Sequence, residues 1–338
     1  MAAFIRTATR SIDIAIYSFS LCPETRQIVL DALRERADAG VSIRIAYDAN
    51  TQQDMIEEAG NDICDIQTST FVQSLGFPSK AIEGYHALMH HKYIVVDAGT
   101  PQAAVWTGSA NFTDDSWRLQ ENNILILRSQ DIAAAYEHDF YELWVDGNLA
   151  PSGEQDSGEG TLRYGGQPAY VQVNFSPGRG EWIDEAITRQ IQRTTERATL
   201  AFVVLTSGDI LRALLDLMAR GVPVEGIYDR TQMAQVIEQW QMVPANHWKI
   251  PAFEQLVRYG RLAGKDSTQY SGNSPHDFMH NKVMVLDDVV ITGSYNFSRH
   301  AQQNAENCLL IHSAPLSTTY RRYIRQIIAR YAGQHEST

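Results

Sequence analysis

Apolar runs and helical patterns alternate along the chain, and they occur in the same order in both halves. In the first half, short apolar runs at 12–19 and 43–48 flank a helical pattern through 29–39. In the second half, the runs at 198–205 and 224–229 also flank a helical pattern. Apolar runs bounded by turn residues predict strands, and their alternation with helices predicts an α/β fold.

The repeat continues to the end of each half. Each half closes with an apolar run, at 124–127 or 309–311, and then a tyrosine-containing helical pattern, at 131–144 or 317–328. One unit of about 150 residues is therefore present twice. We expect each unit to be an α/β/α domain, in which a mixed sheet is flanked by helices.

The predicted domain boundaries follow a change in composition. Residues 151–167 are rich in glycine, serine and acidic residues, which is typical of a linker. We therefore assign 1–150 to the first domain and 168–338 to the second. The first domain has no counterpart of the strand-like run 171–178, so we expect it to lack its first strand. A start further upstream in the gene product would explain the gap, and such a segment could carry a signal peptide, so the location stays open.

Composition and charge restrict the function without fixing it. The chain has 338 residues, of which 44% are hydrophobic, and a formal net charge of −12. No apolar run reaches the length of a membrane span. The net charge argues against coating a long duplex through charge alone, although a basic cleft on an acidic body stays possible. The three cysteines have no metal-type spacing, so we expect no zinc site.

Two copies of one polar motif stand beside buried-strand patterns. Both copies have the spacing H-x-K-x4-D, followed by the sequence G-S-x-N, and a Glu-Asn pair comes ten residues after each asparagine. The first copy consists of His90, Lys92, Asp97, Gly108, Ser109, Asn111 and Glu121, and the second of His280, Lys282, Asp287, Gly293, Ser294, Asn296 and Glu306. A single match of this kind is often accidental, but a second copy with the same tail is not.

Strand periodicity predicts which of these side chains meet. Residues two apart on a strand point to the same side, so His90 and Lys92 project together, as do His280 and Lys282. Asp97 and its counterpart lie five residues further on, on the opposite face. We therefore expect the aspartates to hold local structure and not to touch substrate.

The residue types are suited to phosphoryl transfer. Lysine, serine and asparagine donate hydrogen bonds to an anion, and two facing half-sites would surround one phosphoryl group. One histidine can attack phosphorus, while the other protonates the leaving oxygen and then deprotonates water or an alcohol. Glu121 and Glu306 are the candidates to hold one ring nitrogen of each histidine. This design requires no metal and no cofactor, because the lysines supply the positive charge.

These paired motifs resemble those of the phospholipase D superfamily over nearly the whole chain. The resemblance implies two similar domains related by pseudo-two-fold symmetry, one active site at their interface, a covalent phosphohistidine and metal-independent cleavage of phosphodiesters. It implies His90 as the nucleophile and His280 as the acid and base. It implies a phosphate site made of Lys92, Lys282, Asn111 and Asn296. Ser109 and Ser294 would assist this site. The first copy reads WRLQENN where the second reads QQNAENC, and we expect the glutamates to stay in register. A complete site in one chain removes the need for a dimer, so we expect a monomer, although the oligomeric state stays open.

The substrate is the more difficult prediction. The compact pattern most resembles the bacterial nuclease-like members of the superfamily, so the sequence favours a nuclease. A phospholipase is the alternative, and an inactive binding module is a third hypothesis. Aromatic residues such as Trp248, Tyr259 and Tyr270 could stack on bases, meet acyl chains or only fold the loops. Four nearby cations could line a cleft or form a solvated loop: Lys249, Arg258, Arg261 and Lys265.

One further pattern concerns the last helix. Its apolar stripe consists of Tyr320, Ile324, Ile327 and Tyr331, and arginines lie around it. A basic amphipathic helix can lie on a membrane. The equivalent helix of the first half is acidic with the same aromatic stripe, so we predict that both pack on their own sheets.

Overall fold

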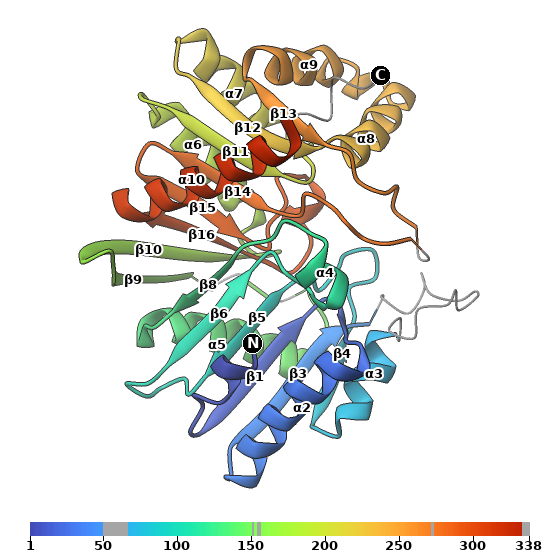
Figure 1. Cartoon of the computed structure of the whole chain (residues 1–338), viewed down its shortest axis with the longest axis vertical. Helices are drawn as coiled ribbons and strands as arrows, with labels where there is room; N and C mark the ends of the chain where they lie inside the picture. The colour runs from blue at the N-terminus through green and yellow to red at the C-terminus, as the bar shows by residue number, and fades with distance from the viewer. Residues whose placement is uncertain (50–66, 151, 154–156, 272–273, 333–338) are drawn as a thin grey trace.

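Two mixed β-sheets form the framework of the protein, one in each half of the chain (Figure 1). The computed structural model describes residues 1–49, 67–150, 152–153, 157–271 and 274–332. The first sheet has the order β4-β3-β1-β5-β6-β8 and the second β13-β12-β11-β14-β15-β16-β10-β9. The strands of the first sheet are β1 (Ser11–Ile16), β3 (Ser42–Asp48), β4 (Ser79–Ile82), β5 (Lys92–Val96), β6 (Ala104–Gly108) and β8 (Ile124–Leu127). Those of the second are β9 (Ser157–Tyr164), β10 (Gln167–Ser176), β11 (Ala198–Phe202), β12 (Val224–Asp229), β13 (Leu262–Lys265), β14 (Lys282–Leu286), β15 (Val289–Gly293) and β16 (Glu306–His312). Two short strands, β2 (Phe19–Ser20) and β7 (Phe112–Thr113), pair separately.

The two sheets repeat one topology, which confirms the predicted internal repeat. In each, three strands run parallel, β1-β3-β4 or β11-β12-β13. Three further strands then continue antiparallel from the first of them, β5-β6-β8 or β14-β15-β16. The predicted mixed sheets of an α/β fold are therefore present.

Helices cover both faces of each sheet. In the first half they are α1 (Ala2–Ile5), α2 (Pro23–Asp38), α3 (Thr68–Leu75), α4 (Asp114–Arg118) and α5 (Gln130–Asp146). In the second half they are α6 (Gly180–Arg193), α7 (Gly208–Ala219), α8 (Arg230–Met242), α9 (Lys249–Tyr259) and α10 (Ala314–Tyr331), with the 3₁₀ turns η2 (Pro244–Asn246) and η3 (His300–Gln302). One apolar cluster lies under α1 to α3, another under α6 to α9, and a third combines α5 and α10 with strands of both sheets. The third cluster joins the two halves.

The segment predicted to be a linker is largely β-structure. Residues 151 and 154–156 lie outside the described residues, but β9 occupies most of the remainder and pairs with β10 along its whole length. Its alternating exposure shows why composition misled: glycine and polar residues face solvent or pack closely on α5, where a Cβ at Gly158 would lie 2.6 Å from Ala135. In the described part of the first half, the sheet ends at β8 and has no strand equivalent to β10.

The last helix packs on its own sheet, as predicted. Helix α10 begins after Ser313, whose hydroxyl accepts a hydrogen bond from the amide of Leu316, and α5 begins in the same way after Ser129. Tyr320, Ile324 and Ile327 are buried, and α10 contacts β11 to β15. None of the helices within the described ranges combines the length and apolar character that crossing a bilayer requires.

Reciprocal hydrogen bonds link the halves in a pseudo-two-fold arrangement. Tyr136 of α5 and Thr107 of β6 both donate to the side-chain oxygen of Asn307 in the second half. Their counterparts Tyr320 and Thr292 donate to the side-chain oxygen of Asn123 in the first half. The interface therefore fixes the start of β8 against β15 and α10, and the start of β16 against β6 and α5.

Candidate active site

His90 lies at the interface and is held by a carboxylate from the opposite half. Its Nδ1 atom is 2.7 Å from Oε2 of Glu306, the first residue of β16, and both side chains are buried. Because the carboxylate accepts the Nδ1 proton, Nε2 is the nitrogen with a free lone pair. The amide of Asn304 also donates to Glu306, which orients the carboxylate further.

His280 is held in the same position by a neutral group. Its Nδ1 atom is 3.1 Å from the side-chain oxygen of Asn122, which precedes β8 in the first half. The amide oxygen accepts the Nδ1 proton but carries no negative charge. The two histidines therefore have the same tautomer and different electrostatic partners.

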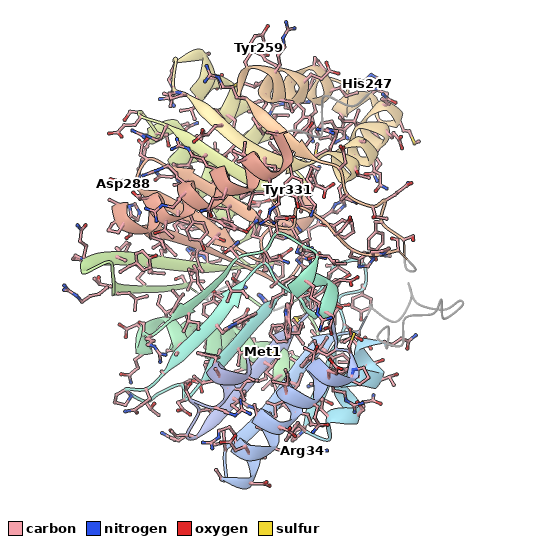
Figure 2. All side chains as sticks on the ribbon, viewed as in Figure 1. Met1, Arg34, His247, Tyr259, Asp288 and Tyr331 are labelled. Atoms are coloured by element: carbon pink, nitrogen blue, oxygen red, sulfur yellow. The ribbon has the colours of Figure 1, made fainter. Side chains whose placement is uncertain are left out.

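Glu121, predicted to hold a histidine, does not do so. Its carboxylate bonds to Lys265, to the hydroxyl of Tyr331 and to Arg330 at 3.4 Å. Tyr331 lies at the boundary between the halves, so this is a buried ionic link across the interface (Figure 2). The prediction that Glu121 holds a ring nitrogen of a histidine is therefore wrong.

The cause is a shift of one residue between the two copies. The amides of Ser109 and Ser294 donate to the carbonyls of Asn123 and Asn307, so these asparagines are equivalent. The first copy has 15 residues from Gly108 to Asn123 (123 − 108), and the second has 14 from Gly293 to Asn307 (307 − 293). Asn122, and not Glu121, is therefore the structural counterpart of Glu306.

The two motif lysines are fully buried beside the histidines. Nζ of Lys92 donates to the carbonyl of His90 at 2.7 Å, and Nζ of Lys282 donates to the carbonyl of His280 at 2.8 Å. Each lysine starts a central strand, β5 or β14, whose β-branched residues fix the backbone. Each ammonium keeps donors available for an anion.

The two motif asparagines have side-chain oxygens with no protein partner. Oδ1 of Asn111 and Oδ1 of Asn296 are both buried, and neither has a hydrogen bond within the described part of the chain. A buried polar atom without a partner is costly unless a ligand supplies one. These two oxygens are acceptors and would meet a donor group of a ligand, whereas the NH₂ group of each side chain is the donor that suits a phosphoryl oxygen.

The two motif serines support the partners of the histidines. The hydroxyl of Ser109 donates to Asn122 at 2.7 Å and accepts the amide of Asn123. The hydroxyl of Ser294 likewise accepts the amide of Asn307 at 3.0 Å and holds Glu306. The predicted direct assistance to phosphate does not fit this geometry, because the hydroxyl protons are already engaged.

The glycines before these serines allow a close approach of two backbones. Gly108 has φ +154° and Gly293 has φ +140°. A Cβ at these positions would lie 2.1 Å from the carbonyl oxygen of Asn123 and 2.3 Å from that of Asn307. Glycine is required here by both space and conformation.

The motif aspartates fold loops at the far end of the strands. The carboxylate of Asp97 accepts the amides of Thr9, Arg10 and Ser11, and that of Asp287 accepts the amides of residues 195–197. Burial alone would raise the pKa of Asp97, but these hydrogen bonds outweigh it and lower the pKa. Both aspartates have positive φ, 53° and 48°, at the turn after the strand.

Two residues beside His90 were not predicted from the sequence. The ring of Tyr17 lies 4.9 Å from the His90 ring and 5.1 Å from Nζ of Lys92. His91 is buried behind the site, with Nε2 3.2 Å from Asp139. Their counterparts in the second half are Val203 and Asn281, whose backbones pair in the same way, so only a residue-by-residue comparison of the halves would have found them.

Burial controls the charges at this site. It lowers the pKa of His90 well below the usual value, and the positive charges of Lys92 and Lys282 act in the same direction. The pKa of His280 is lowered by burial, then by the same two lysines. Burial lowers the pKa of Lys92 to about 7, against the attraction of Glu306, and raises the pKa of Glu306 to about 7, against that of Lys92. A phosphoryl group between the lysines would favour their charged forms.

The geometry defines a class of site: two histidines and two lysines from similar domains, converging on a position for one anion. Among the described residues, no group of three or more His, Cys, Asp or Glu side chains has the arrangement of a metal site. A family model described as "Cardiolipin synthase, PLD-like domain" matches residues 1–144 and 187–328. The chain belongs to the phospholipase D superfamily.

Two curated relatives share part of the chain. The mitochondrial cardiolipin hydrolase of Xenopus tropicalis is 33% identical over 139 residues, which are 41% of this chain and 57% of the relative. The phospholipase D of Rickettsia bellii is 30% identical over 152 residues, which are 44% of this chain and 65% of the relative. The chain thus spans less than two thirds of the length of either relative.

A solved structure shares the fold over almost the entire chain. The phosphatidylserine synthase of Haemophilus influenzae has a TM-score of 0.68 and 14% sequence identity, and it covers 97% of this chain and 82% of its own. This likeness extends to the two-domain arrangement, and at this identity it concerns the fold alone.

Proposed function

We propose that this protein is a metal-independent phosphodiesterase that acts on phospholipids through a phosphohistidine at His90. The observation that carries the chemistry is the pairing of His90 with the Glu306 carboxylate, while His280 faces it with an amide partner. Two buried lysines supply the positive charge that phosphoryl transfer requires.

The first step forms a bond between Nε2 of His90 and phosphorus and breaks the bond from phosphorus to the leaving oxygen. Nε2 of His280 gives its proton to that oxygen. Glu306 stabilises the cationic phosphorylated imidazole of His90, which is why we assign the nucleophile to this histidine. His280, with a neutral partner, holds its proton less tightly and is the better acid.

The second step reverses these roles. Water loses a proton to Nε2 of His280 and attacks phosphorus, and the bond to Nε2 of His90 breaks. The phosphate product leaves, and both histidines return to their starting forms. Lys92, Lys282, Asn111 and Asn296 hold the phosphoryl oxygens through both steps.

Four observations favour a phospholipid substrate over the nucleic acid that the sequence favoured. Relatives named for cardiolipin and phospholipid cleavage match part of the chain, and the net charge is −12. Three of the four cations for which the sequence left open a cleft or a solvated loop are dispersed. Lys249 and Arg258 lie at opposite ends of α9, and Lys265 is buried against Glu121. Tyr259, one of the aromatic residues for which the sequence left base stacking open, lies at the far end of the second domain (Figure 2).

The test measures cleavage in excess EDTA of vesicles containing cardiolipin, phosphatidylglycerol or phosphatidylcholine, beside single-stranded DNA, duplex DNA and RNA. We expect lipid cleavage that survives chelation and falls by about 10³-fold or more in His90→Ala and His280→Ala. Mass spectrometry of the wild type, quenched with base during turnover, is expected to find the phosphoryl adduct on His90 and to find none in His90→Ala. Cleavage of nucleic acid while the lipids stay intact would mean that the protein is a nuclease with the same mechanism. Loss of activity on chelation would contradict the mechanism.

A further inference from the structure

A cavity of about 300 Å³ opens in the second domain beside the turn that carries Asn296. Three cations line it, Arg212 of α7, Lys249 of α9 and Arg299. Arg299 follows Asn296 by three residues, a chain length of at most about 11 Å. The amides of Thr206 and Ser207, also in the lining, bond to the carbonyl of Phe297, the neighbour of Asn296.

Packing fixes two of these cations before any ligand binds. The Arg212 guanidinium lies 4.1 Å from the centre of the Trp248 ring. The same ring packs against Gly208, where a Cβ would lie only 3.1 Å from it. Nζ of Lys249 donates to the carbonyl of Thr206 at 2.9 Å. Such preorganisation lowers the entropic cost of holding an anion.

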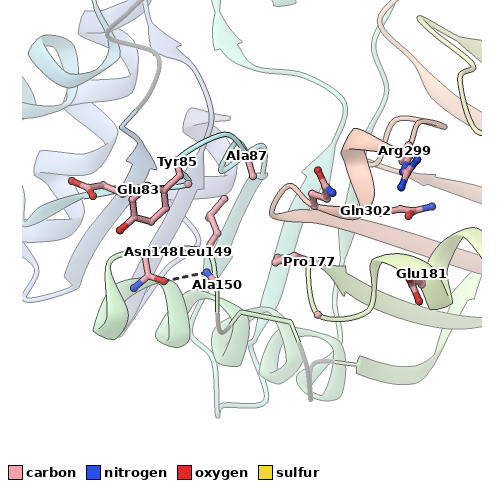
Figure 3. Close-up of a pocket in the computed structure, with 13 residues that line it drawn as sticks. Glu83, Tyr85, Ala87, Asn148, Leu149, Ala150, Pro177, Glu181, Arg299 and Gln302 are labelled. Carbon is pink, nitrogen blue, oxygen red and sulfur yellow. Dashed lines mark hydrogen bonds between the residues drawn. The ribbon is translucent and has the colours of Figure 1, made fainter. Parts of the chain in front are cut away.

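Arg299 is the cation with capacity left for a ligand. Within the described residues no carboxylate pairs with it, and its side chain is exposed. It also lines a second cavity of about 500 Å³ between the domains, where Arg299 and Gln302 lie across from Tyr85 and Leu149 (Figure 3). Both cavities are therefore lined by Arg299, on the loop that leads from Asn296 to Glu306.

The acidic groups in the smaller cavity leave a positive balance. Asp209 is engaged by Arg212 at 3.0 Å, and its side chain is largely exposed. Asp184 is buried and accepts the hydroxyl of Ser207, so three cations stand against two carboxylates in the lining. Burial and the nearby charges of Arg212 and Arg299 lower the pKa of Lys249, so an anion placed among the three would relieve their repulsion.

We propose that this cavity is a second phosphate site, which binds the distal phosphate of a lipid whose two phosphates are bridged by a glycerol, while the proximal phosphate lies between His90 and His280. The inference rests on the proposed function for the identity of the lipid. The site itself requires only two phosphates separated by a short bridge. Arg299 and Lys249 bind the distal phosphate, and Arg212, fixed on Trp248, adds charge at the outer side.

The test uses calorimetry on the full chain with two soluble probes, glycerol 1,3-bisphosphate and glycerol 3-phosphate. We expect the bisphosphate to bind about 10-fold more tightly or better, and Arg299→Gln and Lys249→Gln each to reduce this ratio to about 2-fold. Arg258→Gln is the matched control, because it removes a cation from the other end of α9, outside both cavities. Equal affinity for the two probes in the wild type, or an equal effect of the control, would overturn the proposal.

Vesicle hydrolysis separates this site from the proposed function. If the second phosphate site and the lipid function are both present, cardiolipin is cleaved faster than phosphatidylglycerol. Arg299→Gln then removes this preference by raising the KM for cardiolipin. Lipid cleavage without any preference for the bisphosphate rejects the second phosphate site alone. A bisphosphate preference that depends on Arg299, found without lipid cleavage, rejects the lipid function and retains the site.

Discussion

His90 and His280 differ in the group that holds Nδ1, and this difference divides the two roles in the proposed reaction. A carboxylate stabilises a cationic ring, as a phosphorylated histidine requires, whereas an amide only fixes the tautomer. The distances of 2.7 Å to Glu306 and 3.1 Å to Asn122 agree with a charge-assisted and a neutral hydrogen bond.

The two glutamates near the site are expected to respond oppositely to the same substitution. Glu306→Gln keeps the shape of the side chain but removes the negative charge beside His90, so we expect kcat to fall by about 10³-fold or more. Glu121→Gln breaks the buried link to Lys265, so we expect unfolding to become easier by about 3 kcal/mol, with kcat nearly unchanged. Urea unfolding and initial rates measure both. A larger loss of kcat in Glu121→Gln than in Glu306→Gln would instead support the sequence-based prediction that Glu121 holds a histidine.

Replacing the neutral partner tests the role of His280. In Asn122→Asp the new carboxylate favours the protonated ring, so the pKa of His280 rises. Because the leaving oxygen needs a protonated acid, the basic limb of kcat/KM should move to higher pH by about 1 unit or more. Asn122→Ser, which adds no charge, is the control. An unchanged basic limb would mean that another group protonates the leaving oxygen.

How far the sequence predicts this site depends on local spacing. The repeated H-x-K and G-S-x-N spacings predicted the convergence of histidines, lysines and asparagines, because strand parity fixes which side chains share a face. The partner of His280 was not predictable in the same way. A Glu-Asn pair follows both copies, and the extra residue is taken up where the first half forms α4 and the second forms η3. Only the pairing of β8 and β16 with their neighbours shows the shift.

At the scale of the elements, the site depends on where strands begin. Lys92 and Lys282 start the central strands, and the starts of β8 and β16 carry the partners of the histidines. The sequence predicted these strands from their apolar runs, but it assigned 151–167 to a linker because glycine and serine usually mark one. In β9 those residues serve a strand that packs closely on α5, and tertiary contacts decided against composition.

The close approach of two backbones at Gly293 gives a prediction at the scale of the elements. Gly293→Ala would force a Cβ onto the carbonyl of Asn307 and displace Glu306, so we expect a loss of stability of about 3 kcal/mol and of most activity. Gly221→Ala has a similarly positive φ, +82°, but no atom within 4 Å. We expect it to cost about 1 kcal/mol and to leave kcat unchanged. Thermal unfolding and initial rates compare the two, and similar losses in both would show that backbone strain alone is responsible.

At the scale of the whole molecule, the two halves bring like charges together at their interface. Burial is the first cause that lowers the pKa of both lysines, to about 7 for Lys92 and well below its usual value for Lys282, and the charge of Lys92 lowers the pKa of Lys282 further. Anion binding reverses this, and it links the affinity of the site for an anion to pH.

Sulfate provides the measurement, because it stays a dianion across the neutral range. Below the lowered lysine pKa the binding form is already present, whereas at higher pH sulfate must bind together with a proton. We therefore expect sulfate to raise Tm more at about pH 6 than at about pH 9. Lys92→Met should reduce both the protection and its pH dependence. Equal protection of the wild type at both pH values would contradict a lowered lysine pKa.

The duplication within one chain has a consequence for inheritance. In an assembly of two identical subunits, a mutation at one half-site appears at the other, so both histidines would keep the same neighbours. Here each half has its own codons. Tyr17, His91 and Asn122 of the first half occupy the positions of Val203, Asn281 and Glu306 in the second half. Each such difference leaves the other half unchanged. Two half-sites within one chain can therefore diverge separately, as the proposed roles of attack on phosphorus and proton donation require.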